Sequence, residues 1–347
     1  MNNKNQLGVE FFAVLLLTFA VLLSLVIALF VIMNDSNDIP NIDDEPVYDT
    51  EDDSPSLNVS LDKSSLFPTV PSRTSYVIGR SANVETIGSE IKSQYTILVD
   101  LSTYESVAEK GADEKIYPAS MTKVMTLIIA CENIKNAKTK LTVTEELVNF
   151  AAVNGASGAG LKPGDSYTVE ELLYLIAYQS DTVASHLIAQ HVAGSEAEFV
   201  TLMNEKVSQL GLTKTRFANC TGLYDDNNYT TCREMAAIMA YALDNDMVYK
   251  CLSSYEGRKM TVGDKDCTFY AGWYSQRFSD NPRFTGGKVI AGKTGYTDES
   301  GYTLVSCAEI SGKRYINVIV TRMQKDGLKL DNSQSAAEVK YVYKTYS

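Results

Sequence analysis

The chain has 347 residues, 45% of them hydrophobic, so it can bury the core of one large domain or of two small ones. Residues 1–62 hold one lysine against eleven acidic residues, a balance of -10 that leaves only -2 of the total of -12 for residues 63–347. A charge this close to neutral indicates neither the basic surface of a nucleic-acid-binding protein nor an acidic binding surface.

Residues 11–33 form an apolar run, FFAVLLLTFAVLLSLVIALFVIM, that contains no charged residue. About 20 such residues span the hydrocarbon core of a bilayer, so the run predicts a transmembrane anchor. Lys4 precedes the run and an acidic segment follows it, which favours a single-pass cell-membrane protein with residues 1–10 in the cytoplasm and the rest outside. The alternative is a cleaved signal peptide, but the run is long for a signal sequence and no small-x-small cleavage site follows it.

Residues 34–71 are polar, acidic and rich in proline. Such a segment cannot bury enough apolar area to offset the entropy lost on ordering, so we expect a flexible stalk that its own charges keep extended. An acidic partner-binding tail is the less favoured alternative. Residues 72–347 are then expected to form the folded domain, outside the membrane.

Six cysteines lie in the predicted extracytoplasmic part, where disulfides are permitted. Cys131 and Cys307 sit in apolar runs and are expected to be buried as small hydrophobic side chains. The remaining four could form two local bridges, Cys220 with Cys232 and Cys251 with Cys267. The spacing of the cysteines resembles no zinc motif.

The first two thirds of this domain begin with a strand pattern and continue with helix patterns. Residues 95–100 read as a strand that ends near a turn at 109–113. A long apolar helix is expected from Ser120 to Ala130, because Pro118 just outside and a serine in the first turn are helix-start signals. Three further stretches have helical spacing of their apolar residues, and Gly211 is expected to end the last of them: 169–177, 183–192 and 196–210.

The last third changes character. Residues 301–308 and 314–321 are β-rich and are joined through Ser-Gly-Lys at 311–313, a hairpin signal. Residues 333–346 read as a closing helix. This order predicts one α+β unit in which an antiparallel sheet, built from both chain ends and flanked by helices, encloses a helical insertion.

The chain has only two histidines, His186 and His191, five residues apart in one predicted helix. This is not the i,i+4 spacing that presents two metal ligands on one face, and no glutamate accompanies them in a ligand pattern. A Ser-His-Asp mechanism would need one of them beside a nucleophile, and we expect both to be structural. A nucleophilic serine would therefore take its base from another residue type, and lysine is the candidate.

The pattern Ser-x-x-Lys supplies such a pair, because residues i and i+3 share one face of a helix. It occurs three times, starting at Ser60, Ser89 and Ser120. Only Ser120 and Lys123 open a helix whose remainder is apolar. Burial disfavours the charged amine, which is what a lysine acting as a base requires.

A second element is the tripeptide Lys293-Thr294-Gly295, at the expected edge of the C-terminal sheet. An edge strand can pair with an extended peptide substrate, and the Lys293 ammonium would attract a terminal carboxylate. Gly295 would let the two backbones approach closely. Alone, the tripeptide would be better interpreted as a β-turn with a surface lysine.

A third element, Ser180-Asp181-Thr182, interrupts two apolar helical stretches. A serine at such a break could project into a cleft. The alternative is an ordinary helix N-cap for the stretch at 183–192, and in isolation the cap is favoured.

The three elements together, in this order, resemble the motif set of penicillin-binding proteins and class A β-lactamases. The resemblance runs from about residue 95 to about residue 321 and is closest to the serine D-Ala-D-Ala carboxypeptidases, the low-molecular-weight penicillin-binding proteins. It is carried by five stretches: IYPASMTKVMT (116–126), GLKPGD (160–165), TVEELLY (168–174), FANCTGL (217–223) and GKTGYTDESGY (292–302).

The resemblance implies a penicillin-binding/β-lactamase-like fold and an acyl-enzyme on Ser120, formed from peptidoglycan stem peptides that end in D-Ala-D-Ala. It implies that Lys123 is the base and that Ser180 relays a proton to the leaving amine. No metal or organic cofactor is implied, and β-lactams are expected to trap the nucleophile. The remaining implied roles concern the substrate: Thr182 contacts it, Lys293, Thr294 and Gly295 hold its carboxylate end, and the N–H groups of Ser120 and Tyr296 form the oxyanion hole.

Two positions depart from the family pattern. Thr182 stands where the family usually has asparagine, and Asn228 where many relatives have histidine. Two alternatives remain. One is a class A-like β-lactamase, which would need a glutamate to activate the deacylating water, and the corresponding region 215–223 has no glutamate. The other is a non-catalytic module that senses peptidoglycan or β-lactam. Both active serines and both lysines are retained, so a working carboxypeptidase is the favoured interpretation.

Overall fold

The computed structural model describes residues 75–279, 281–321 and 332–347, all within one compact unit, Asp62–Ser347. The predicted cytoplasmic segment 1–10, anchor 11–33 and stalk 34–71 lie outside the described residues. Within the described ranges, none of the helices has both the length and the apolar character needed to cross a bilayer.

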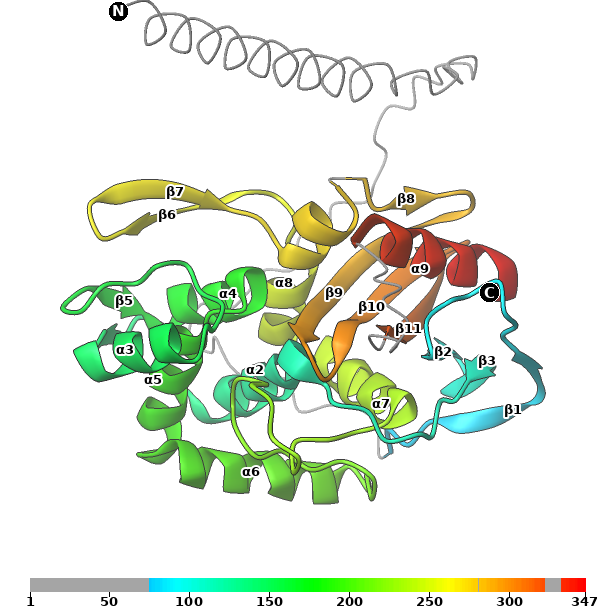
Figure 1. The fold of residues 1–347 in the computed structure, drawn as a ribbon, viewed down its shortest axis with the longest axis horizontal. Coiled ribbons are helices and arrows are strands. Elements are labelled where there is room, and N and C mark those ends of the chain that lie inside the picture. Colours follow the sequence, from blue (N-terminus) through cyan, green and yellow to red (C-terminus); the bar gives the residue numbers. More distant parts are fainter. Residues whose placement is uncertain (1–74, 280, 322–331) are drawn as a thin grey trace, which may run out of the picture. The chain divides into compact units, whose positions relative to one another are not determined.

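A seven-stranded sheet forms the centre of the domain (Figure 1). Three strands come from the N-terminal part of the domain and four from the C-terminal part, so the prediction of a sheet built from both chain ends is confirmed. The two parts meet where β2 pairs with β11, antiparallel, from Tyr95 with Val320 to Asp100 with Tyr315. The strand order is β1 (Gly79–Thr86), β3 (Glu105–Lys110), β2 (Tyr95–Asp100), β11 (Lys313–Thr321), β10 (Gly301–Ile310), β9 (Gly287–Thr297) and β8 (Arg283–Phe284).

The sheet is mixed, and the prediction of a purely antiparallel sheet is wrong in this respect. β1 runs parallel to β3, with Gly79 opposite Glu105. The arrangement is possible with a short connection because β1 ends, and β2 begins, at the same end of the sheet. Residues 87–94 only have to pass over the end of β3, and Ile87 and Ile91 in this connection are buried.

The α-helices of the described residues lie between β3 and β9 in the chain, apart from α9, which follows β11. α9 packs on one face of the sheet, and α7 and α8 pack on the opposite face, where they meet α2 (Figure 1). Two short two-stranded sheets, β4 with β5 and β6 with β7, lie outside the main sheet, and only the second is a hairpin. The bounds are α2 (Thr122–Asn133), α3 (Glu145–Val153), α4 (Val169–Gln179), α5 (Thr182–Ala193), α6 (Glu196–Gln209), α7 (Cys232–Leu243), α8 (Asp246–Ser253), α9 (Asn332–Tyr346), β4 (Lys140–Thr142), β5 (Ser166–Thr168), β6 (Arg258–Val262) and β7 (Lys265–Phe269).

The long predicted elements are confirmed to within a few residues. α4 begins with a capping box, in which Thr168 and Glu171 satisfy each other's backbone N–H groups. Gly211 follows α6 with a φ of 72°, as a helix-ending glycine should. The hairpin at 311–312 joins β10 to β11. The predicted turn at 109–113 overlaps the end of β3, a strand that the sequence pattern did not indicate, and the chain turns only from residue 111.

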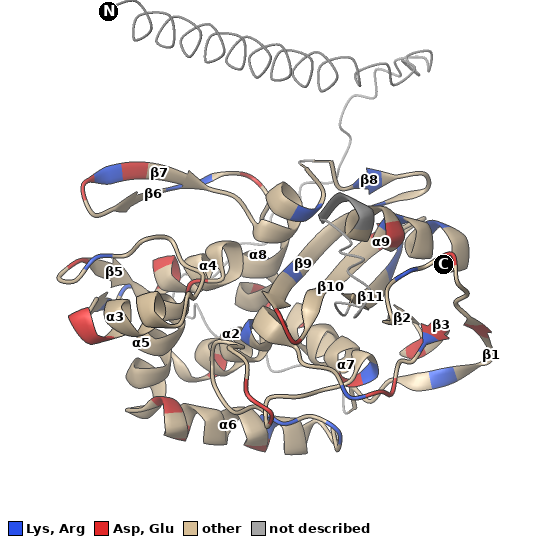
Figure 2. Cartoon of the chain, viewed as in Figure 1, with Lys and Arg blue, Asp and Glu red and all other residues tan. Residues whose placement is uncertain are grey.

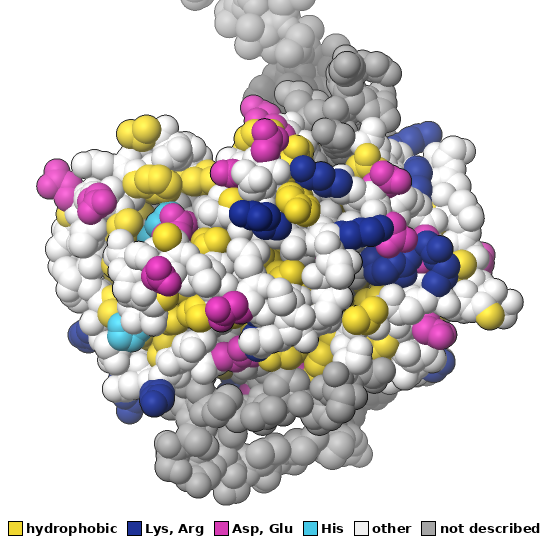
Figure 3. Space-filling view, turned by 90° about the horizontal axis from the view of Figure 1, so that it is seen from below, with side chains coloured by type: hydrophobic (Ala, Val, Ile, Leu, Met, Phe, Trp, Pro, Cys, Tyr) yellow, Lys and Arg dark blue, Asp and Glu magenta, His cyan; other side chains and the backbone are white. Residues whose placement is uncertain are grey.

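α2 is the centre of the core: every residue from Thr122 to Cys131 is buried. Charged residues of both signs are interspersed over the outer elements (Figure 2), and the face seen in Figure 3 carries acidic and basic side chains close together. This distribution agrees with the near-neutral charge of residues 63–347.

All six cysteines are free thiols, so the two local bridges considered from the sequence do not form. Cys220 and Cys251 are buried in the core, and Cys232 opens α7, where it is also fully buried. Cys131 and Cys307 are buried as predicted.

Candidate active site

Ser120 lies in a 3-10 turn, Ala119–Met121, that leads directly into α2. Lys123 follows one turn later, and its Nζ donates a hydrogen bond to Ser120 Oγ at 3.2 Å. The predicted i,i+3 pairing of serine and lysine is therefore present at the start of a buried helix.

Two glycines make room for this turn. Ala119 has a φ of 47°, a left-handed conformation that is unfavourable for a residue with a side chain. A Cβ on Gly222 would lie 2.0 Å from the Ala119 carbonyl oxygen, and a Cβ on Gly295 would lie 2.7 Å from the Ser120 nitrogen. The turn is thus clamped between β9 and the 219–222 loop, so the Ser120 and Tyr296 backbones lie close to each other across Gly295.

Lys123 is only 1% exposed, and its Nζ donates a second hydrogen bond to the Thr221 carbonyl. Burial lowers the pKa of Lys123 to about 8, against the opposing influence of Cys220 and Asp181. A substantial fraction of the amine is then neutral near physiological pH. A neutral amine next to a serine hydroxyl can accept its proton.

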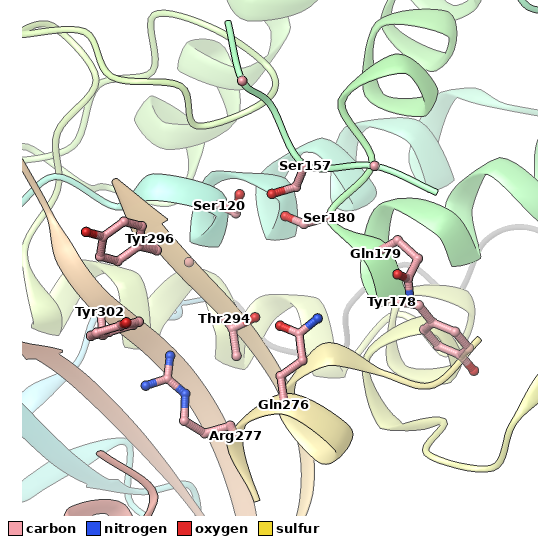
Figure 4. Close-up of a pocket in the computed structure, with 13 residues that line it drawn as sticks. Ser120, Ser157, Tyr178, Gln179, Ser180, Gln276, Arg277, Thr294, Tyr296 and Tyr302 are labelled. Atoms are coloured by element: carbon pink, nitrogen blue, oxygen red, sulfur yellow. The ribbon is translucent and has the colours of Figure 1, made fainter. Parts of the chain in front are cut away.

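Ser180 ends α4 in a left-handed conformation, with a φ of 54°. The next residue, Asp181, is the N-cap of α5 and accepts a hydrogen bond from the Ala184 N–H. Because Asp181 caps the helix, the Ser180 hydroxyl can face the cleft. Lys293 Nζ donates to Ser180 Oγ at 3.0 Å. Figure 4 shows Ser120, Ser157 and Ser180 pointing toward one space.

Lys293 lies beneath the cleft surface and is 2% exposed. Its second hydrogen bond goes to the Thr294 carbonyl, at 2.8 Å. Burial holds the pKa of Lys293 well below its usual range, and the charge of Lys123 lowers it further. The amine is therefore suited to exchanging a proton with Ser180.

The cleft has a volume of about 490 Å³. The strand that carries Lys293-Thr294-Gly295 borders it, and β8 pairs only with Gly287 and Lys288 of that strand. The predicted edge position of the motif is confirmed. The cleft is lined by Ser120, Gly155, Ser157, Gly158, Tyr178, Gln179, Ser180, Gln276, Arg277, Thr294, Gly295, Tyr296 and Tyr302.

The two departures from the family pattern lie behind this surface. Thr182 is 2% exposed and is not among the lining residues, and its N–H donates to the Ser157 carbonyl at 3.0 Å. Asn228 is buried as well, and its amide donates to Thr122 Oγ1 at 3.3 Å. Their contacts hold the loop around Ser157 and the first turn of α2.

Arg277 is the charged residue among the described residues that line the cleft, and the sequence did not indicate it. It ends a π-helix, Trp273–Arg277, and is 3% exposed. Its Nη2 donates weakly to the Thr303 carbonyl at 3.4 Å, while Nε and Nη1 have no hydrogen-bond partner among the described residues. Burial lowers the pKa of Arg277 to about 10. In Figure 4 the guanidinium points toward Thr294 and Tyr302.

The backbone of the domain has the same fold as solved DD-peptidases. A variant of the Streptomyces K15 DD-transpeptidase superposes with a TM-score of 0.62, at 24% identity, over 73% of this chain and 97% of that one. A D-alanyl-D-alanine carboxypeptidase from Mycobacterium tuberculosis H37Rv gives a TM-score of 0.62 at 20% identity, over 77% of this chain and 94% of that one. At these identities the likeness shows the fold.

Sequence comparison specifies the family. Residues 80–324 match the model of the D-alanyl-D-alanine carboxypeptidase family, Peptidase S11, and the chain belongs to this family. It is 33% identical to the D-alanyl-D-alanine carboxypeptidase DacF of Bacillus subtilis, over 67% of this chain and 58% of that protein. It is 35% identical to the Escherichia coli enzyme DacC, over 65% and 55%. The chain thus spans little more than half the length of these curated relatives.

Proposed function

We propose that the protein is a serine-type D-Ala-D-Ala carboxypeptidase that acts on peptidoglycan stem peptides through an acyl-enzyme on Ser120. The observation that carries this proposal is the hydrogen bond between Lys123 Nζ and Ser120 Oγ, 3.2 Å long, with a lysine whose charged form is disfavoured by burial. Family membership supports the same substrate class.

In the acylation step, neutral Lys123 accepts the proton of Ser120 Oγ as the oxygen attacks the carbonyl of the D-Ala-D-Ala bond. The negative charge that develops on the carbonyl oxygen is stabilised by the N–H groups of Ser120 and Tyr296, and one such donor contributes about 3 kcal/mol. The C–N bond then breaks, and the leaving amine receives a proton through Ser180, which Lys293 holds at 3.0 Å. Water releases the shortened peptide by the reverse proton path.

The terminal carboxylate of the substrate would be held by Thr294 and Arg277. Lys293 is already engaged with Ser180 and the Thr294 carbonyl beneath the surface, so it would not contact the carboxylate directly. Arg277 Nε and Nη1 are buried and have no partner in the described part of the chain, and a carboxylate would satisfy one of them by a charge-assisted hydrogen bond. The peptide backbone of the substrate would pair with the free edge of β9.

The class A-like β-lactamase is the weaker candidate. That mechanism needs a carboxylate that activates the deacylating water, and no aspartate or glutamate is among the described residues that line the cleft. Slow release of a penicilloyl group, and hence covalent inhibition by β-lactams, follows from the same observation. A non-catalytic sensor would also be acylated by a β-lactam but would release no D-Ala from a peptide.

We also infer that residues 11–33 anchor the protein in the cell membrane as a single span. Residues 1–10 would lie in the cytoplasm, with the stalk 34–71 and the catalytic domain 72–347 outside. The uncharged run and the opposite charges that flank it support this arrangement.

A direct test is to incubate the protein with a diacylated D-Ala-D-Ala peptide and to measure free D-Ala. The wild-type protein should release D-Ala and bind a fluorescent penicillin one-to-one, and Ser120→Ala should lose both activities. Ser89→Ala removes the serine of another Ser-x-x-Lys pattern and should change neither. One-to-one penicillin binding without D-Ala release would favour the sensor, and undiminished labelling of Ser120→Ala would refute the assignment of the nucleophile.

A further inference from the structure

Behind the lysine of the active site lies a second charged pair, formed by His186 of α5 and Glu196 of α6. His186 Nε2 is 3.2 Å from Glu196 Oε2, and the two side chains are 7% and 32% exposed. The proposed mechanism uses neither residue. A partly buried ion pair next to a catalytic helix calls for a physical explanation.

Glu196 reaches the backbone that holds the catalytic lysine. Its Oε1 accepts a hydrogen bond from the Cys220 N–H at 3.0 Å. The carbonyl of the next residue, Thr221, accepts from Lys123 Nζ, and the Cys220 carbonyl accepts from Thr126 of α2 at 2.6 Å. One carboxylate thus fixes the peptide segment whose carbonyl orients the Lys123 amine.

The other end of the pair reaches the opposite wall of the cleft. His186 Nδ1 donates to the Thr182 carbonyl at 2.9 Å, and the Thr182 N–H donates to the Ser157 carbonyl. Because Nδ1 carries the proton of this bond, Nε2 can face a carboxylate favourably only when it is protonated as well. The hydrogen bonding therefore requires an imidazolium paired with a carboxylate.

The surroundings agree with this charge state. Burial alone would lower the pKa of His186, but the hydrogen bond and charge of Glu196 outweigh it and leave the pKa raised, against repulsion from Lys123. Burial would raise the pKa of Glu196, but His186 and Cys220 lower it to about 2. The Phe150 ring of α3 covers the imidazole at 4.8 Å.

We propose that His186 and Glu196 are positioning residues, which hold the Cys220–Thr221 backbone so that Lys123 stays aligned with Ser120. This inference rests on the proposed function, in which Lys123 is the base. The three side chains His186, Glu196 and Cys220 also bring ligand-type atoms within 4.8 Å of one another. Glu196 already accepts from the Cys220 N–H and pairs with His186, so its carboxylate is engaged without a metal ion.

The test compares variants of Glu196 in the full chain, with rates expressed per penicillin-titrated site. Glu196→Gln keeps an acceptor for the Cys220 N–H and a group that can bond a neutral His186, so acylation should stay within about threefold of wild type. Glu196→Ala loses both bonds, and its limiting acylation rate should fall about tenfold or more, while the concentration of penicillin that half-saturates the rate stays unchanged. Equal rates for the alanine and glutamine variants would overturn the proposal.

Two variants of His186 separate its hydrogen bond to Glu196 from its hydrogen bond to the Thr182 carbonyl. The amide nitrogen of His186→Gln lies near the position of Nε2 and can still donate to Glu196, whereas that of His186→Asn lies near Nδ1 and can donate only to the Thr182 carbonyl. The proposal predicts faster acylation by the glutamine variant, and the reverse order would overturn it. His191→Asn and Glu198→Ala change exposed residues of the same two helices and serve as controls that should not alter the rate.

A readout without substrate separates this proposal from the proposed function. The titration of Lys123, followed by NMR of lysine labelled at Nζ, should move in Glu196→Ala and stay in place in Glu196→Gln. If the pKa of Lys123 shifts in Glu196→Ala but the wild-type protein releases no D-Ala, the proposed function alone is refuted. If the pKa of Lys123 does not shift in Glu196→Ala, the positioning role is overturned, even when the enzyme is active. Loss of acylation on treatment with a chelator, restored by zinc, would show a metal cluster and overturn the ion-pair description.

Discussion

The guanidinium of Arg277 gives the sharpest test of how the cleft holds its substrate. In the free enzyme Nε and Nη1 are buried without a partner in the described part of the chain, and the proposed carboxylate ligand would satisfy one of them. Arg277→Leu removes the charge and keeps an apolar side chain of moderate size. The substitution should therefore act in opposite directions on substrate turnover and on stability.

A hydrogen bond to a charged group contributes about 1.5–3 kcal/mol, so the loss of this contact should slow D-Ala release by roughly ten- to a hundredfold. The loss should apply to peptides with a free terminal carboxylate and be much smaller for the same peptides ending in an amide. An unsatisfied buried donor costs about 1–3 kcal/mol, so Arg277→Leu should raise the free energy of unfolding by about 1 kcal/mol.

The assay measures D-Ala or D-Ala-amide release from paired acid and amide peptides, together with urea unfolding. Arg258→Leu is the control, because Arg258 is half-buried, is paired with Glu170 and does not line the cleft. Equal losses for acid and amide peptides would refute the carboxylate role of Arg277. A fall in the free energy of unfolding would show that the guanidinium is satisfied in the free enzyme.

Three further predictions follow from the site and the boundaries. The acylation rate should rise with pH through about 8, because the neutral form of Lys123 increases as the pH passes its pKa of about 8. A rate that does not depend on pH between about 6 and 9 would contradict Lys123 as the base. Thr182→Asn changes a residue that is buried behind the cleft surface, so D-Ala release should stay within about threefold of wild type and penicillin should still bind one-to-one. A markedly faster release would show that residue 182 reaches the substrate. A shortened chain that begins at Ser72 should be soluble, monomeric and as active as the detergent-extracted protein, and misfolding would place the domain boundary earlier.

The sequence predicted the parts of the site that depend on local patterns. Ser120 and Lys123 were distinguishable from the two other Ser-x-x-Lys patterns because only they open an apolar helix. The edge position of Lys293-Thr294-Gly295 and the break at Ser180 were predicted for the same reason: local composition determines where a helix or strand ends.

Features that arise from packing of distant segments could not be predicted. The left-handed conformation of Ala119 exists because Gly222 and Gly295, far apart in the chain, both leave space for it. Arg277 lies in a segment with no recognisable pattern, and its place in the cleft depends on how the π-helix packs against β9. The parallel pairing of β1 likewise depends on a connection whose path is set by the burial of Ile87 and Ile91.

The pairing of β2 with β11 has a consequence for how the chain is made. Asn317 of β11 donates to the Ile97 carbonyl of β2 across 220 residues of sequence. The middle of the sheet therefore cannot assemble until nearly the whole chain has left the ribosome, and contacts this distant in sequence form slowly. Until β9, β10 and β11 are in place, the sheet face that packs on α7 and α8 is incomplete. The partly folded protein should therefore expose apolar surface and be most prone to aggregation before its last strands are added.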